Sequence, residues 1–71
     1  MKEKNKIDYI ALALILSFEE AKDFILQYDF FNQKKKVKRK LIKELSLKKG
    51  VYCDIILRRL KNVKYLMNIN V

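Results

Sequence analysis

Proline is absent from the sequence, and glycine occurs once, at Gly50. A sandwich or barrel of short strands needs turn residues at regular intervals, so this scarcity argues against an all-β fold. Histidine and tryptophan are also absent, and Cys53 is the only cysteine. The chain therefore cannot form an internal disulfide, and it lacks the usual cysteine and histidine ligands of a zinc site.

The same absences exclude several kinds of catalytic site. Ser17 and Ser46 have no histidine to activate them, and Cys53 lacks one as well. No glycine-rich loop is present to hold phosphates. Three acids can meet on one helical face, but Lys22 lies among them, so we interpret this group as a solvated face: Glu19, Glu20 and Asp23. We expect no enzymatic activity, no metal and no cofactor.

The residues that are abundant favour helices. Lysine, leucine, glutamate and alanine are good helix formers, and 51% of the residues are hydrophobic, which argues against general disorder. With 71 residues the chain forms one domain at most. A core of that size buries only about 60% of the unfolded surface. We therefore predict a single all-α domain, residues 1–71, stabilised by close helix packing, self-association or a partner.

Hydrophobic periodicity predicts three helices, over about 7–31, 34–48 and 51–67. The first has an apolar stripe with steps of four and three: Ile7, Ala11, Leu14, Phe18, Ala21, Ile25 and Tyr28. The inward residues of the second are Val37, Leu41, Ile42 and Leu45. The apolar arc of the third comprises Tyr52, Ile56, Leu60, Val63 and Met67. A polar joint at Asn32-Gln33 separates the first two helices, and Gly50 separates the last two.

Residues 9–18 are apolar on almost every side. Their apolar run is well short of the ~20 residues that cross a membrane. The preceding lysines resemble the start of a secretory signal, but Glu19 and Glu20 follow where small residues should prepare cleavage. We therefore expect an intracellular protein. A chain this small cannot easily bury such an apolar helix by itself. We therefore expect a homodimer in which this helix packs against a second copy.

Charge is divided unevenly along the chain. Residues 1–32 carry four lysines and six acids, a net charge of −2, whereas residues 33–71 carry thirteen Lys or Arg and two acids, a net charge of +11. This imbalance indicates an anionic partner for the C-terminal half. The densest run of basic residues comprises Lys34, Lys35, Lys36, Lys38, Arg39 and Lys40. Such a run is typical of a phosphate-contacting segment, a nuclear-import signal or a solvated surface.

Residues 43–62 combine a small residue, Ser46, where two helices would touch, with a turn residue, Gly50. The residues expected to pack the two helices together are Leu45, Val51, Ile56 and Leu60. This segment resembles the helix-turn-helix of the phage repressor and Cro type, in which one helix braces another that lies in the major groove. The resemblance implies that Tyr52 and Cys53 face DNA, whereas helical periodicity places Tyr52 toward the core.

The predicted third helix has a polar face suited to reading bases. Its residues are Arg58, Lys61, Asn62 and Tyr65. Arginine or lysine can address guanine, asparagine can address adenine, and tyrosine can stack on a base or contact phosphate. The same residues also suit the solvated face of an amphipathic helix.

We expect a small basic protein that binds nucleic acid, DNA rather than RNA, as a transcriptional regulator or an accessory factor of a mobile element or virus. Two alternatives stay open. One is a cationic protein that acts at anionic membrane surfaces, since an apolar helix precedes a polybasic segment. The other is a protein–protein adaptor or inhibitor.

Overall fold

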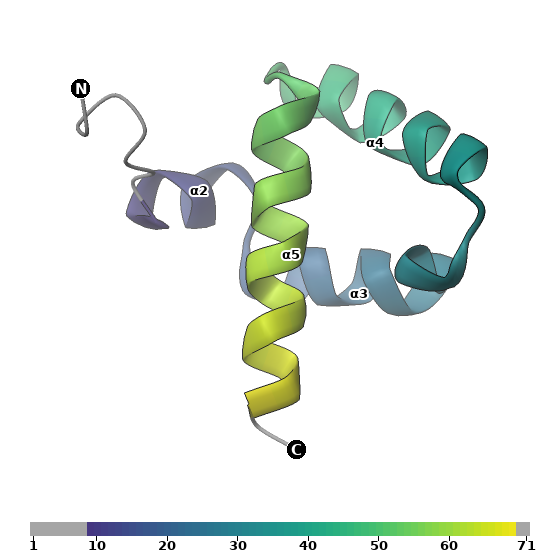
Figure 1. Ribbon diagram of the computed structural model, residues 1–71. Helices are drawn as coiled ribbons and strands as arrows, with labels where there is room; N and C mark the ends of the chain where they lie inside the picture. Colours follow the sequence, from purple (N-terminus) through teal and green to yellow (C-terminus); the bar gives the residue numbers. More distant parts are fainter. Residues whose placement is uncertain (1–8, 70–71) are drawn as a thin grey trace, which may run out of the picture.

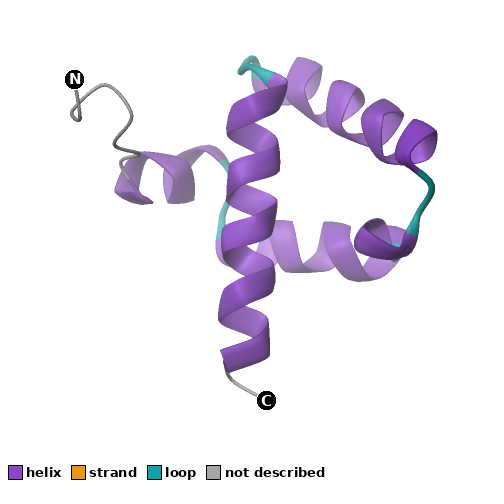
Figure 2. Cartoon of the chain, in the orientation of Figure 1, coloured by secondary structure: helices purple, strands orange, loops and turns teal. Residues whose placement is uncertain are grey.

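The computed structural model describes residues 9–69, which are almost entirely helical (Figures 1 and 2). The helices are α2 (Tyr9–Ile15), α3 (Phe18–Tyr28), α4 (Lys35–Lys49) and α5 (Cys53–Ile69), with a 3-10 turn, η1 (Phe30–Asn32), before α4. No strand occurs within residues 9–69, so the all-α class is confirmed. In Figure 1, α5 stands upright, with α2 on one side and α4 on the other, and α3 passes behind it.

The prediction of a single helix over 7–31 is wrong, because the helix is interrupted between α2 and α3. Ser17 is extended at this point, and its hydroxyl accepts a hydrogen bond from the Glu20 backbone N–H at 3.1 Å. Serine followed three residues later by glutamate is a signature of a helix N-terminus. This local capping stops one helix and starts the next, although the apolar stripe continues through it. The predicted beginning at Ile7 lies outside the described residues.

The break changes which side of α2 is buried. Leu12 and Leu16 are buried, whereas Leu14, expected on the inward stripe, is 83% exposed, and Ala11 is exposed too. On α3 the expected stripe holds at Ala21 and Ile25, which are buried, and at Phe18, which is half-buried. Tyr28 was also expected on this stripe, but it is 39% exposed at the last residue of α3, where the chain turns away. Because α2 is a separate helix, its buried residues need not continue the 3.6-residue periodicity of α3. No helix within residues 9–69 is long and apolar enough to cross a membrane.

The polar joint between α3 and α4 begins earlier than predicted. α3 ends at Tyr28, and Asp29 adopts a left-handed backbone with φ of +49°. The Asn32 amide donates to the Asp29 carboxylate at 2.8 Å, and the Gln33 amide donates to the Tyr28 carbonyl at 2.7 Å. These two hydrogen bonds stabilise the turn between α3 and α4, which is why polar residues are suited to this connection.

One core lies where α3, α4 and α5 meet, with Leu16 closing it from the end of α2. α5 contributes its centre, since Ile56, Leu60 and Val63 are fully buried. α4 contributes Ile42 and Leu45 as predicted, and Leu41 is half-buried. Val37 was also expected to face inward, but it is 39% exposed. It lies in the first turn of α4, the end of the helix that diverges from α5 in Figure 1.

Arg59 lies on the buried side of α5, at 5% exposure. Its Nε–H donates to the Leu16 carbonyl at 2.7 Å, and its Nη1 donates to the Asn62 side-chain oxygen at 2.9 Å. Burial lowers the pKa of the Arg59 guanidinium, which still stays charged, as arginine does in proteins. A cation beside the last carbonyls of a helix is favourable, so Arg59 joins the end of α2 to α5.

Candidate nucleic-acid interface

A three-residue connection joins α4 to α5. Gly50 has φ of +70°, and the N–H groups of Gly50 and Val51 both donate to the Ser46 carbonyl, at 2.8 and 3.1 Å. This is a glycine-terminated helix end of the kind that the sequence predicts here. A side chain at position 50 would meet no atom within 4 Å, so glycine is required by the backbone conformation and not by lack of space.

The contacts between α4 and α5 involve the residues that the sequence predicts to pack these two helices together. Ser46 is buried where the helices approach each other, and its hydroxyl donates to the Lys43 carbonyl at 2.9 Å. The Cys53 thiol in turn donates to the Ser46 hydroxyl at 3.4 Å. The apolar residues expected to pack the helices are buried or half-buried: Leu45, Val51, Ile56 and Leu60. The segment is thus built as a braced pair of helices.

Tyr52 corrects the sequence prediction. Periodicity placed it on the core side of the third helix, but it is 85% exposed. The reason is that α5 begins only at Cys53, so Tyr52 lies in the connection, where helical periodicity does not apply. Cys53 is exposed as well. Both side chains therefore lie on the surface.

The polybasic run occupies the N-terminus and first turns of α4. Lys38 is half-buried, and the other five side chains are exposed: Lys34, Lys35, Lys36, Arg39 and Lys40. Within residues 9–69 none of the six forms an ion pair. The first turn of α4 contains no acid. Cations at a helix N-terminus oppose the helix dipole, and negative charge is stabilising there. The first turn of α4 therefore carries unfavourable charge that no acid of the same turn compensates.

The polar face of α5 is partly as expected. Arg58, Lys61 and Tyr65 are exposed and share one side of the helix. Asn62 differs, because it is half-buried and its side-chain oxygen already accepts the hydrogen bond from Arg59. Sequence reasoning overlooked Arg59, although a cation three residues after Ile56 and four before Val63 falls on the buried arc. Asn62 therefore positions Arg59, and its oxygen already accepts one of the two hydrogen bonds that an amide oxygen can accept.

The side of α4 next to α5 has an open hollow, and both helices carry exposed cations. The hollow, of about 410 Å³, lies between the helices and is lined by Arg39, Ile42, Lys43, Cys53, Asp54 and Leu57. Two of the residues that line it, Arg39 and Lys43, belong to a set of exposed cations that we name the basic face: Lys36, Arg39, Lys40 and Lys43 of α4 with Arg58 and Lys61 of α5. No ion pair within residues 9–69 involves any of these cations.

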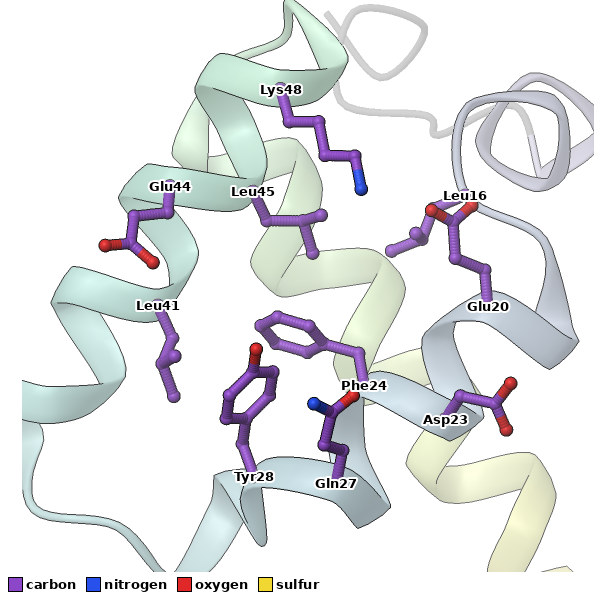
Figure 3. A pocket seen from close by; sticks show the side chains of 10 residues that line it. All are labelled: Leu16, Glu20, Asp23, Phe24, Gln27, Tyr28, Leu41, Glu44, Leu45 and Lys48. Atoms are coloured by element: carbon purple, nitrogen blue, oxygen red, sulfur yellow. The ribbon is translucent and has the colours of Figure 1, made fainter.

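The other side of α4 carries a different surface, the acid-rimmed groove between α3 and α4 (Figure 3). It encloses about 320 Å³ and is lined by Leu16, Glu20, Asp23, Phe24, Gln27, Tyr28, Leu41, Glu44, Leu45 and Lys48. The Glu20 carboxylate pairs with the Lys49 ammonium at 2.8 Å. Lys48 and Lys49 are therefore set apart from the basic face, although they belong to the same basic half of the sequence.

Comparison with protein-family models, curated proteins and solved structures finds no significant match.

Proposed function

We propose that this protein binds nucleic acid, duplex DNA in preference to RNA, through the basic face of α4 and α5. The observation that carries the proposal is the set of unpaired cations on two helices that meet at a glycine corner. Four cations outside the basic face do have a partner: Lys22 with Glu19, Lys49 with Glu20, Arg59 with Leu16 and Asn62, and Lys64 over the Phe31 ring. Phosphates would supply the missing partner.

The N-terminus of α4 supports the same proposal. Three lysines in succession, Lys34 to Lys36, begin this helix without an acid in the first turn. Each opposes the helix dipole at a cost of about 0.3–1 kcal/mol. A phosphate backbone beside them would remove this cost and would release counterions from the DNA. α4 would then contact the backbone, while Arg58 and Lys61 of α5 face the bases.

The first test is the dependence of affinity on salt. Log affinity for a duplex should fall linearly with log salt, with a slope of about −0.9 for each phosphate contact. Replacing the six basic residues of the run (Lys34, Lys35, Lys36, Lys38, Arg39 and Lys40) by glutamine should weaken binding to every sequence, on the order of 10²-fold or more, and should flatten the slope. Fluorescence anisotropy with a labelled duplex measures both quantities.

A matched control uses cations that lie outside the basic face. The triple variant Lys22→Gln, Lys48→Gln, Lys64→Gln removes three charges, as does the triple variant Lys36→Gln, Arg39→Gln, Lys40→Gln. The second should bind far more weakly than the first. Equal losses would mean that net charge alone drives binding. If vesicles of anionic lipid bind while duplexes do not, the membrane-surface alternative replaces the proposal.

We also propose that two copies associate through α2. Leu14 is 83% exposed on a helix that contains no charged residue, in a protein whose other exposed helical faces are mostly charged. Two such helices can pack without repulsion between like charges. A dimer would also present two basic faces to DNA, as helix-turn-helix proteins commonly do. Sedimentation equilibrium should show a dimer, and Leu14→Lys should convert it to a folded monomer.

A further inference from the structure

We propose that the hollow between α4 and α5 holds one unpaired nucleobase that carries an exocyclic amino group, such as cytosine. This inference rests on the proposed function and adds the form of nucleic acid to it. The floor of the hollow is apolar, since it is formed by Ile42 and Leu57, and Arg39 and Lys43 stand beside it. An apolar floor suits the flat face of a base, and the two cations suit the phosphates on either side of the nucleotide.

The size of the hollow agrees with such a ligand. Its volume of about 410 Å³ lies at the lower end of the ~300–1,000 Å³ that small-molecule pockets span. A base inside a duplex is stacked on both faces and cannot enter, so the hollow selects bases that are unpaired or turned out of the stack. Duplex binding along the rest of the basic face does not require the hollow to be filled.

Asp54 gives the hollow its chemical preference. It is an acid on an otherwise basic face, and its carboxylate forms no ion pair within residues 9–69, even with Arg58 four residues further on. Repulsion between phosphate and carboxylate makes Asp54 a cost for binding any nucleic acid backbone. A carboxylate that accepts a hydrogen bond from the amino group of cytosine offsets this cost, and thymine offers no such donor at that position. Asp54 thus distinguishes amino-bearing bases from thymine or uracil.

Cys53 provides a built-in reporter, because it is the only cysteine of the chain, is exposed and lines the hollow. The experiment measures by mass spectrometry how fast N-ethylmaleimide modifies Cys53 in the intact protein. The protein is saturated in turn with a cytidine dodecanucleotide, a thymidine dodecanucleotide, a duplex of the same length and inorganic polyphosphate. We expect the cytidine oligonucleotide to slow modification by about tenfold and polyphosphate to slow it by less than about twofold, since polyphosphate has no base to fill the hollow.

Two variants with the same change of charge complete the test. The wild type should bind the cytidine oligonucleotide about tenfold more tightly than the thymidine one, a contrast typical of one base-edge contact. Asp54→Ala should abolish this contrast, mainly because it strengthens binding of the thymidine oligonucleotide, for which no hydrogen bond offsets the repulsion. Glu44→Ala removes one negative charge on the groove side of α4 and should preserve the contrast.

The outcomes separate the two proposals. If the oligonucleotides and the duplex all fail to bind, the proposed function falls, and this inference falls with it. If they bind but Cys53 reacts as fast as in the free protein, or is protected equally by polyphosphate, the hollow is not a base site and the proposed function stands. Protection by phosphatidylglycerol vesicles without protection by oligonucleotides would assign the hollow to an acyl chain and overturn the inference.

Discussion

The two sides of α4 carry opposite kinds of surface. Toward α5, Arg39 and Lys43 flank an apolar hollow and have no acidic partner among the described residues. Toward α3, acids line a groove of similar size, and Glu20 neutralises Lys49. The surface of the hollow is mostly apolar, whereas polar and apolar side chains share the surface of the groove. Their difference in charge lies in whether the neighbouring helix brings carboxylates, which α3 does and which α5 does only through Asp54.

This contrast shows that the charge of a sequence segment is not the charge of a surface. The half from residue 33 onward carries a net charge of +11, yet its cations divide between the basic face, the groove and the buried contacts of Arg59. Acids of α3, in the other half of the chain, decide which cations are neutralised. Because α3 packs against α5 beside α4, its Glu20 reaches Lys49 of α4. A long-range field from the net charge steers a polyanion toward the molecule, but unpaired local cations hold it.

The largest expected effect comes from the core that both surfaces share. Leu60 is fully buried in the core cluster that also contains Ile42 and Leu45. Leu60→Ala should lower the free energy of unfolding by about 2–5 kcal/mol, the usual range for a buried leucine. Tyr65→Ala, on the exposed side of the same helix, should change it by less than about 0.5 kcal/mol. Urea denaturation measures both values, and similar losses would show that the two faces of α5 are assigned wrongly.

The corner between α4 and α5 should have the next largest effect. Gly50→Ala forces a side chain into a left-handed conformation and should cost about 1–2 kcal/mol of stability. Gly50→Asn should cost less, because asparagine tolerates that conformation better. Since Gly50 joins the helices of the hollow and lies outside the groove, Gly50→Ala should also raise the Cys53 reaction rate in the folded protein. An unchanged stability for Gly50→Ala would contradict the turn geometry.

Charge reversal on the two sides of α4 tests the contrast directly. Lys40 belongs to the basic face and Lys48 lines the groove, and both are exposed on the same helix. Lys40→Glu should weaken duplex binding by about tenfold, since it removes one phosphate contact and adds repulsion. Lys48→Glu should weaken it by less than about threefold through the change in net charge. Equal effects would show that the phosphates follow the whole length of α4.

The smallest expected effect concerns the ion pair between Glu20 and Lys49. The pair is partly exposed, with side-chain exposures of 39% and 22%, and such pairs contribute about 0.2–1 kcal/mol. Glu20→Gln should therefore lower stability by no more than about 1 kcal/mol. It also releases Lys49, so duplex affinity should rise slightly at low salt. A fall in affinity would indicate that the pair shapes the basic face, contrary to the separation of the two surfaces.

Several elements follow from local patterns and were predicted. The glycine corner, the inward residues of α5 and the start of α4 depend on residues a few positions apart, within reach of periodicity and capping rules. The break at Ser17 also had a local signal, serine followed by Glu20, but the apolar stripe that continues across it concealed the signal. Tyr52 was misplaced for a related reason, because a helix boundary moved by two residues takes a side chain from the core to the surface.

The sequence by itself determined that the protein is helical, that α5 has a buried side centred on Leu60, and that cations crowd its C-terminal half. Only the tertiary structure decided which cations have partners. Glu20 meets Lys49 across 29 positions, and Arg59 meets the Leu16 carbonyl across 43. Such pairs depend on the angles at which helices cross, and those angles follow from how the side chains of the whole core fit together. No local spacing of residues contains that information.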